Sequence, residues 1–144
     1  MQSNEKQQKA IITKDMVITG SVEVITDMEI HGVVHGNVTS QGNLLITGIV
    51  EGDIVTKGAT IVASKMQANI SANDYIDIHE DCEITGDLSA NNISVNGSVK
   101  GNLNASGHIA LKEKSMVLGD LQTGSLEIRK GAVINGKIAF TPTN

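Results

Sequence analysis

Four histidines and one cysteine are the side chains of this sequence with the richest chemistry. His31 and His35 lie four residues apart, a spacing that on a helix would bring two metal-binding imidazoles together. On a path of strand, corner and strand they do not share a face, so we interpret both as solvated histidines. His79 and His108 stand alone near predicted turns and are interpreted in the same way. Cys82 falls at a small inward position, where we expect an inert buried thiol and not a nucleophile.

Glu51 and Asp53 form a pair of carboxylates two residues apart, a spacing that places both on one side of a strand. Paired carboxylates on the wall of a β-helix would indicate an enzyme that acts on polysaccharides. No aromatic platform for a sugar ring accompanies them, because the chain has one Tyr, one Phe and no Trp. Tyr75 stands alone, so the sequence favours a solvated surface at this position.

Phosphate chemistry has no motif in the chain. The Gly-x-x-x-x-Gly-Lys-Ser/Thr loop that cradles nucleotide phosphates is missing, and so is the Gly-x-Ser-x-Gly elbow of a serine nucleophile. The formal net charge of -5 argues against a nucleic-acid partner, since binding to phosphates requires a basic face. We therefore expect no enzyme activity, with no catalytic residue, no cofactor, no metal and no nucleotide.

The repeat aliphatic-x-Gly-x-aliphatic is the strongest pattern, and it predicts the elements that carry these side chains. It occurs eight times, with steps of 15 to 18 residues between consecutive central positions. The central residues are Gly20, Gly36, Gly52, Ala68, Gly86, Gly101, Gly119 and Gly136. A second aliphatic pair lies between copies, from Ala10 and Ile12 at the start to Leu126 and Ile128 at the end.

Alternation with a period of two predicts strands with one buried face, and a repeat near 17 residues fits one coil of a β-helix. We predict an all-β, single-domain solenoid of about eight coils of 15–18 residues. At about 4.8 Å a coil, eight coils form a rod about 38 Å long. The central glycine would let the walls approach closely or permit a backbone angle that other residues resist. Insertions such as 79–81 and 129–131 are expected at one corner only.

Composition agrees with such a fold. Hydrophobic residues make up 40% of the chain but aromatic residues only 1%, so the core must consist of thin aliphatic layers. A single cysteine excludes an internal disulfide and fits a reducing compartment. The start, Met1 to Lys9, lacks the apolar region of a signal peptide, and no window approaches 18 apolar residues. The sequence thus predicts a cytoplasmic protein.

A left-handed hexapeptide helix, as in acyltransferases, is the main structural alternative. It requires an aliphatic residue every six positions and coils of 18 residues, whereas here the aliphatics lie four apart and then at irregular gaps. The pattern itself does not fix the handedness of the winding.

One outward column follows the central position of each repeat and is rich in amides and carboxylates. Its residues are Ser21, Asn37, Asp53, Asn69, Asp87, Asn102, Asp120 and Lys137. Stacked coils would place them in a row, either as a solvated amide ladder or as a row that holds a cation. The Asp-rich nonapeptide repeat that binds calcium is absent.

The string Gly-x-x-x-Gly-x-aliphatic recurs at Gly32–Val38, Gly48–Ile54 and Gly97–Leu103, and on this series the chain resembles the bactofilins over residues 10–140. The resemblance implies a right-handed, three-faced β-helix that polymerises without nucleotide into non-polar filaments, joining like ends. It also implies a scaffold in bacterial cell shape, placement of cell-wall proteins, chromosome organisation or motility. Many relatives carry an apolar N-terminal membrane-targeting peptide. Met1 to Lys9 is polar and departs from that pattern, which places direct membrane binding in question.

A β-helix has two open ends, each with unpaired strand edges over a slice of core, and such edges pair with another chain unless they are capped. Four residues, 141–144, follow Phe140, too few to cover an end. We predict that Phe140, Ile138 and Ile134 form the C-terminal polymerisation contact and that Ile12, Met16 and Ile18 form the N-terminal one. The alternative for Phe140 is that it folds over its own core as a plug.

The sequence thus predicts three segments: a disordered polar tail over residues 1–9, a β-helix polymerisation domain over 10–140, and a short disordered tail over 141–144. The expected partner is a second copy of the chain. A paralogue and cell-envelope proteins that recruit the filament to the inner face of the membrane are further candidates. The alternative function is a β-helical enzyme, either a hexapeptide-type acyltransferase or a carbohydrate-active protein.

Overall fold

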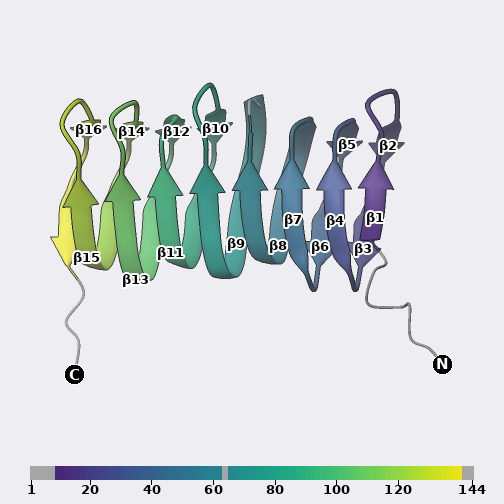
Figure 1. The fold of residues 1–144 in the computed structure, drawn as a ribbon, viewed down its shortest axis with the longest axis horizontal. Coiled ribbons are helices and arrows are strands. Elements are labelled where there is room, and N and C mark those ends of the chain that lie inside the picture. The colour runs from purple at the N-terminus through teal and green to yellow at the C-terminus, as the bar shows by residue number, and fades with distance from the viewer. Residues whose placement is uncertain (1–8, 63–64, 141–144) are drawn as a thin grey trace.

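The computed structural model describes residues 9–62 and 65–140. The two predicted tails lie outside the described residues, except for Lys9, with which the first strand begins. No described residue is helical, and the strands lie side by side along one rod, with β1 and β17 near its opposite ends (Figure 1). The strands are β1 (Lys9–Ile12), β2 (Val17–Thr19), β3 (Val22–Val24), β4 (Asp27–Ile30), β5 (Val33–His35), β6 (Val38–Ser40), β7 (Asn43–Ile46), β8 (Ile49–Ile61), β9 (Lys65–Ile78), β10 (Glu83–Thr85), β11 (Leu88–Val95), β12 (Ser98–Lys100), β13 (Leu103–Leu111), β14 (Met116–Leu118), β15 (Leu121–Ile128), β16 (Val133–Asn135) and β17 (Ile138–Phe140).

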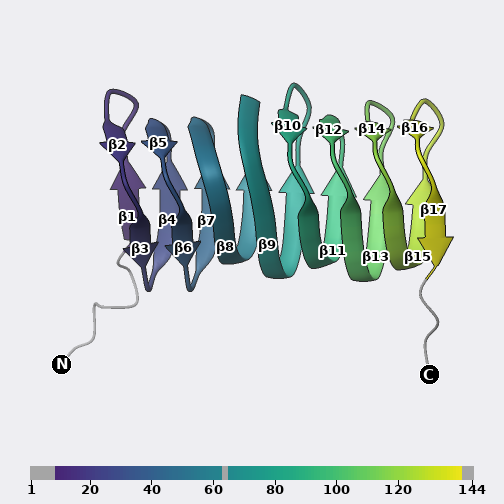
Figure 2. The same cartoon turned by 180° about the vertical axis from the view of Figure 1, so that it is seen from behind.

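Parallel pairing arranges these strands on three faces, each with eight rungs. The first face holds β1, β4, β7 and the last parts of β8, β9, β11, β13 and β15. The second face holds β2, β5, the first parts of β8 and β9, and then β10, β12, β14 and β16. The third face holds β3, β6, the middle of β8 and β9, the first parts of β11, β13 and β15, and β17 (Figure 2). The predicted three-faced solenoid of about eight coils is confirmed. Its handedness stays a prediction.

We number the coils 1 to 8 by their central residues, Gly20 to Gly136. Consecutive repeats stack as the pattern predicts. The aliphatic residue two positions before each centre pairs with its equivalent, for example Val34 with Val50 and Val99 with Val117. The second aliphatic pairs stack likewise, for example Ile30 with Ile46. These side chains point inward and are fully buried in the inner coils. Burial of such aliphatic ladders is the main favourable contribution to the fold, at about 25 cal/mol for each Å² of apolar surface removed from water.

The central glycines show why the repeat needs them. At Gly86 the backbone φ is +145°, and a Cβ placed there would lie 1.9 Å from the carbonyl oxygen of Ala68 in the coil before. Both predicted reasons for glycine, close approach and an unusual backbone angle, are therefore present. Ala68 does not have a positive φ, and β9 runs without a break through this position from Lys65 to Ile78.

One detail of the prediction is wrong: the coils do not vary in length at a single corner. Turns of variable length do occur between the first and second faces, as at 79–82 and 129–132. The register also shifts at the corner between the third and first faces, where one residue after Ala90 stands against two residues after Ala105. Each irregularity is local, because the paired strands on both sides keep the buried aliphatics in line.

In the part of the chain that the structure describes, no helix is long and apolar enough to cross a membrane.

Candidate polymerisation interface

Each end of the rod presents strands that are paired on one side only. At the N-terminal end β1 pairs with β4, β2 with β5 and β3 with β6, and no described strand lies on their other side. At the C-terminal end the same holds for β16, which pairs with β14, and for β17, which pairs with β15. A strand edge of this kind offers a row of free N–H and C=O groups to another chain.

The C-terminal end exposes apolar side chains that occupy inward positions. Phe140 pairs with Thr123 in the register, in a column whose inner members are small. No described coil lies beyond it, and 61% of Phe140 and 37% of Ile138 are exposed. Ile134 is half-buried against the end of the core. The structure thus brings the three residues of the predicted C-terminal contact together on the last coil.

The N-terminal end is more closed. Met16 is 43% exposed at the corner before β2, and Ile18 is half-buried. Ile12, by contrast, is only 4% exposed, because it points into the core beneath Ile30. Of the three residues predicted for this contact, Met16 and Ile18 offer accessible surface to a partner, and Ile12 belongs to the buried core.

Sequence reasoning missed several exposed aliphatics near the ends. Ile25, at 75%, lies in the turn between β3 and β4, where the other coils carry polar or small residues. Ile128, at 47%, is the last described member of an inward ladder, and no described coil lies beyond it. The signal for Ile128 was present in the repeat itself, since Ile128 belongs to the last of its eight copies. The signal for Ile25 was an aliphatic side chain at a corner where the other coils carry polar or small residues.

A cluster of charges ties the first coil to the second. The Nζ of Lys9 lies 2.6 Å from Oε2 of Glu29, and Oε1 of Glu29 lies 3.0 Å from Nε2 of His31. Nδ1 of His31 lies 2.6 Å from the Thr47 hydroxyl in the third coil. The hydrogen bond from Lys9, with that from His31, lowers the pKa of the Glu29 carboxyl, and the same bond with Glu29 raises the pKa of Lys9. These contacts hold the edge strand β1 against its neighbour.

The predicted amide and carboxylate column is a hydrogen-bonded ladder. A side-chain oxygen of one residue accepts the backbone N–H of the equivalent residue in the next coil, at 2.9 to 3.1 Å. The accepting residues are Asn37, Asn69, Asp87, Asn102 and Asp120. The step from Asp53 to Asn69 joins two side chains, since Nδ2 of Asn69 donates to Oδ1 of Asp53 at 3.2 Å. Lys137 ends the ladder in coil 8 and has no oxygen to accept the next N–H.

The other chemical candidates lie apart. His35 contacts Oε1 of Glu51 at 2.9 Å, and His79 lies 3.5 Å from Asp77. His108 contacts the Ser125 hydroxyl at 2.7 Å, and Cys82 is buried with its thiol 3.2 Å from the carbonyl of Ile61. Over residues 9–62 and 65–140, no three His, Cys, Asp or Glu side chains gather where they could hold a metal ion.

A comparison with protein families matches residues 47–139 to the model of the bactofilins, described as polymer-forming cytoskeletal proteins. The chain belongs to the bactofilin family. The match covers most of coils 3 to 8, and the same repeat and register continue through coils 1 and 2. No curated protein and no solved structure match the chain.

The bactofilin family is described as polymer-forming. The open strand edges at the two ends of this rod are the features that fit polymer formation. A polymer-forming family implies self-association, so the first partner is a second copy of the chain.

Proposed function

We propose that this bactofilin assembles end to end into filaments without nucleotide and serves as a cytoskeletal scaffold. The observation that carries the proposal lies on the last described coil, where the side chain of Phe140 is 61% exposed at a position that is buried in inner coils. Covering Phe140 and Ile138 with a second chain would remove apolar surface from water and pair the free edges of β16 and β17. Neither the burial of apolar surface nor the pairing of these strand edges requires a bound nucleotide.

Like ends join in this proposal, as the family resemblance implies. The hydrogen-bonded ladder supports it, because Lys137 stands where inner coils carry an Asn or Asp oxygen. In a head-to-tail joint the N–H of Ser21 would follow Lys137 and find no side-chain acceptor there. A joint between two C-terminal ends does not need to continue this ladder.

The cellular role proposed is a scaffold in the cytoplasm that supports cell shape, the placement of cell-wall proteins or motility. Cell-envelope proteins would recruit the filament to the inner face of the membrane, and a paralogue would join it. The family description supports the cytoskeletal part of this proposal.

Substitution of Phe140 by Arg tests the proposal. Arginine places a charge in the centre of the contact, so we expect the variant to remain in the supernatant at speeds that pellet the wild type. Val55→Arg is the matched control, since Val55 is 51% exposed but points outward from the side of the rod in coil 3. A Phe140→Arg variant that pellets like the wild type, with the control unaffected, would remove Phe140 from the joint.

A further inference from the structure

The second face of the rod differs from the third face in its outward side chains. These form two columns, one on each side of the buried ladder. The first column, from coil 1 to coil 8, is Val17, Val33, Ile49, Lys65, Glu83, Ser98, Met116 and Val133. The second column is Thr19, His35, Glu51, Gln67, Thr85, Lys100, Leu118 and Asn135.

Aliphatic side chains lie at both ends of this face and charges lie in the middle. Val17 is 65% exposed and Ile49 40%, and towards the other end Met116 is 44% and Val133 50% exposed. By contrast, the third face presents outward residues that are mostly polar, such as Thr39, Ser71, Ser89, Asn104 and Gln122.

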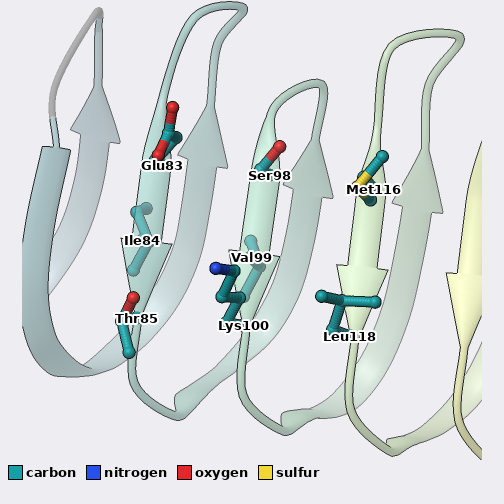
Figure 3. A pocket seen from close by; sticks show the side chains of 8 residues that line it. All are labelled: Glu83, Ile84, Thr85, Ser98, Val99, Lys100, Met116 and Leu118. Atoms are coloured by element: carbon teal, nitrogen blue, oxygen red, sulfur yellow. The ribbon is translucent and has the colours of Figure 1, made fainter.

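A depression of about 100 Å³ marks the sixth coil on this face. It forms because Ser98 is small and lies between the longer Glu83 and Met116 of the flanking coils, as Figure 3 shows. Lys100 and Leu118 complete its rim, while Ile84 and Val99 point back into the core.

We propose that two rods pair side by side through this face in an antiparallel arrangement. The two coils that face each other then have numbers that add up to nine, so that coil 1 lies against coil 8 and coil 4 against coil 5. A two-fold axis along the strand direction, between coils 4 and 5, generates this arrangement and keeps each column opposite itself. Ile49 of coil 3 then faces Ser98 of coil 6, which places an exposed aliphatic side chain over the depression. Val17 faces Val133, and Val33 faces Met116.

The charges of the middle coils fit the same operation. Lys65 of coil 4 meets Glu83 of coil 5 in the first column, and Glu51 of coil 3 meets Lys100 of coil 6 in the second. Each pair occurs twice in the symmetric interface. Within the described residues, Lys65, Glu83 and Lys100 have no ion pair, and Glu51 has its contact with His35.

A parallel arrangement in the same register fits the face less well. A two-fold axis along the rod keeps each coil opposite its own copy but sets the first column against the second. Lys65 would then face Gln67, and Ile49 would face Glu51, so that no charge of this face meets an opposite charge. Charges that are covered without a partner lose their hydration, so the face itself selects the antiparallel pair.

The size of the face indicates when pairing becomes visible. A face about 38 Å long and roughly 10 Å wide buries on the order of 400 Å² on each rod, which is below the area of a stable dimer interface. Single rods should therefore pair only weakly. Rods linked end to end present many such faces at once, and their contacts add along the filament. In this respect the inference rests on the proposed function.

Charge reversal tests the pairing in filaments. Electron microscopy should show paired filaments for the wild type, separate single filaments for Lys100→Glu, and restored pairs for the double variant Glu51→Lys with Lys100→Glu. Both positions are exposed on the surface, so the rod should fold in each variant. Paired filaments in the Lys100→Glu variant, or single filaments in the double variant, would overturn the proposed register.

Cysteine cross-linking tests the same face whether or not filaments form. Residues 51 and 100 lie three coils apart in one chain, too far for an internal disulfide, but they meet in the antiparallel pair. With Cys82 buried, a concentrated solution of Glu51→Cys with Lys100→Cys should yield disulfide-linked dimers under mild oxidation. Each single variant should not. The absence of dimers in the double variant, or self-linked Lys100→Cys chains, would contradict the pairing. An absence of filaments with these dimers present would instead count against the proposed function alone.

Discussion

At the residue scale, the central glycine is the position where the coil tolerates least change. In the inner coils its hydrogen atom faces the carbonyl of the residue one coil before, as for Gly86 over Ala68. Gly20 has a comparable backbone angle, φ +126°, but a Cβ at this position would meet no atom within 4 Å, because Gly20 lies in the first coil. The two positions therefore separate backbone strain from steric contact.

Gly86→Ala should be more destabilising than Gly20→Ala. Both changes impose the strain of an unfavourable φ, about 1–3 kcal/mol. Gly86→Ala adds overpacking against the neighbouring coil, a further ~1–3 kcal/mol. Denaturant unfolding measured by circular dichroism compares the two variants directly. Equal losses of unfolding free energy would show that close approach is not what the glycine provides.

The ladder residues give a second comparison at this scale. Asn102→Ala removes the oxygen that accepts the N–H of Asp120 at 3.0 Å, so the free energy of unfolding should fall by about 0.5–1.5 kcal/mol. Asn104 is an exposed amide on the strand that follows, and its side chain makes no hydrogen bond within the described chain, so Asn104→Ala is the control. A ladder that contributes nothing would make the two variants equally stable.

At the scale of strands and coils, much could be predicted from the sequence because each coil repeats the same inward aliphatic pairs. The register of Val34 on Val50 or Ile76 on Ile93 follows from the repeat alone. The length of β8 and β9 does not, because strand pairing continues around the corners, through Gly52 in β8 despite its positive φ and through Ala68 in β9. The second variable corner was also missed, since small insertions there leave the aliphatic spacing nearly unchanged.

Some features of the candidate polymerisation interface could be predicted from the sequence and others could not. The exposure of Phe140 and Ile138 could be predicted, because both belong to the last of the eight copies of the repeat. The burial of Ile12 and the exposure of Ile25 could not, because both depend on how the first coil closes. The proposed pairing of Glu51 with Lys100 across two rods emerges only when the register fixes the coil in which each residue lies.

The first coil should be sensitive to acid. Hydrogen bonds with Lys9, and to a lesser extent with His31, lower the pKa of the Glu29 carboxyl. This carboxylate therefore stabilises the folded state at pH values above its unfolded pKa, near 4.5. That contribution is lost as the pH falls through the lower, folded pKa. Thermal unfolding between about pH 5 and pH 3 should therefore weaken less in Glu29→Gln than in the wild type. Lys9→Met should behave similarly, because Lys9 is the main cause of the lowered pKa of Glu29. Identical acid profiles for all three proteins would show that the contact between Lys9 and Glu29 does not contribute to acid sensitivity.

At the scale of the whole molecule, the two ends act independently if like ends join. Phe140→Arg then blocks only the C-terminal joint and leaves dimers held through their N-terminal ends. Combination with Met16→Arg should give monomers. Size-exclusion chromatography with light scattering distinguishes these states, and a Phe140→Arg variant that is monomeric by itself would indicate a head-to-tail joint.

The central claim is that open coils make this rod a subunit of a filament. The most direct measurement is electron microscopy with fibre diffraction of the purified chain in a buffer without nucleotide. We predict long filaments with a meridional reflection near 4.8 Å, about the spacing of stacked strands, and no change when ATP or GTP is added. Dispersed single rods at every concentration, or filaments that form only with nucleotide, would contradict the account.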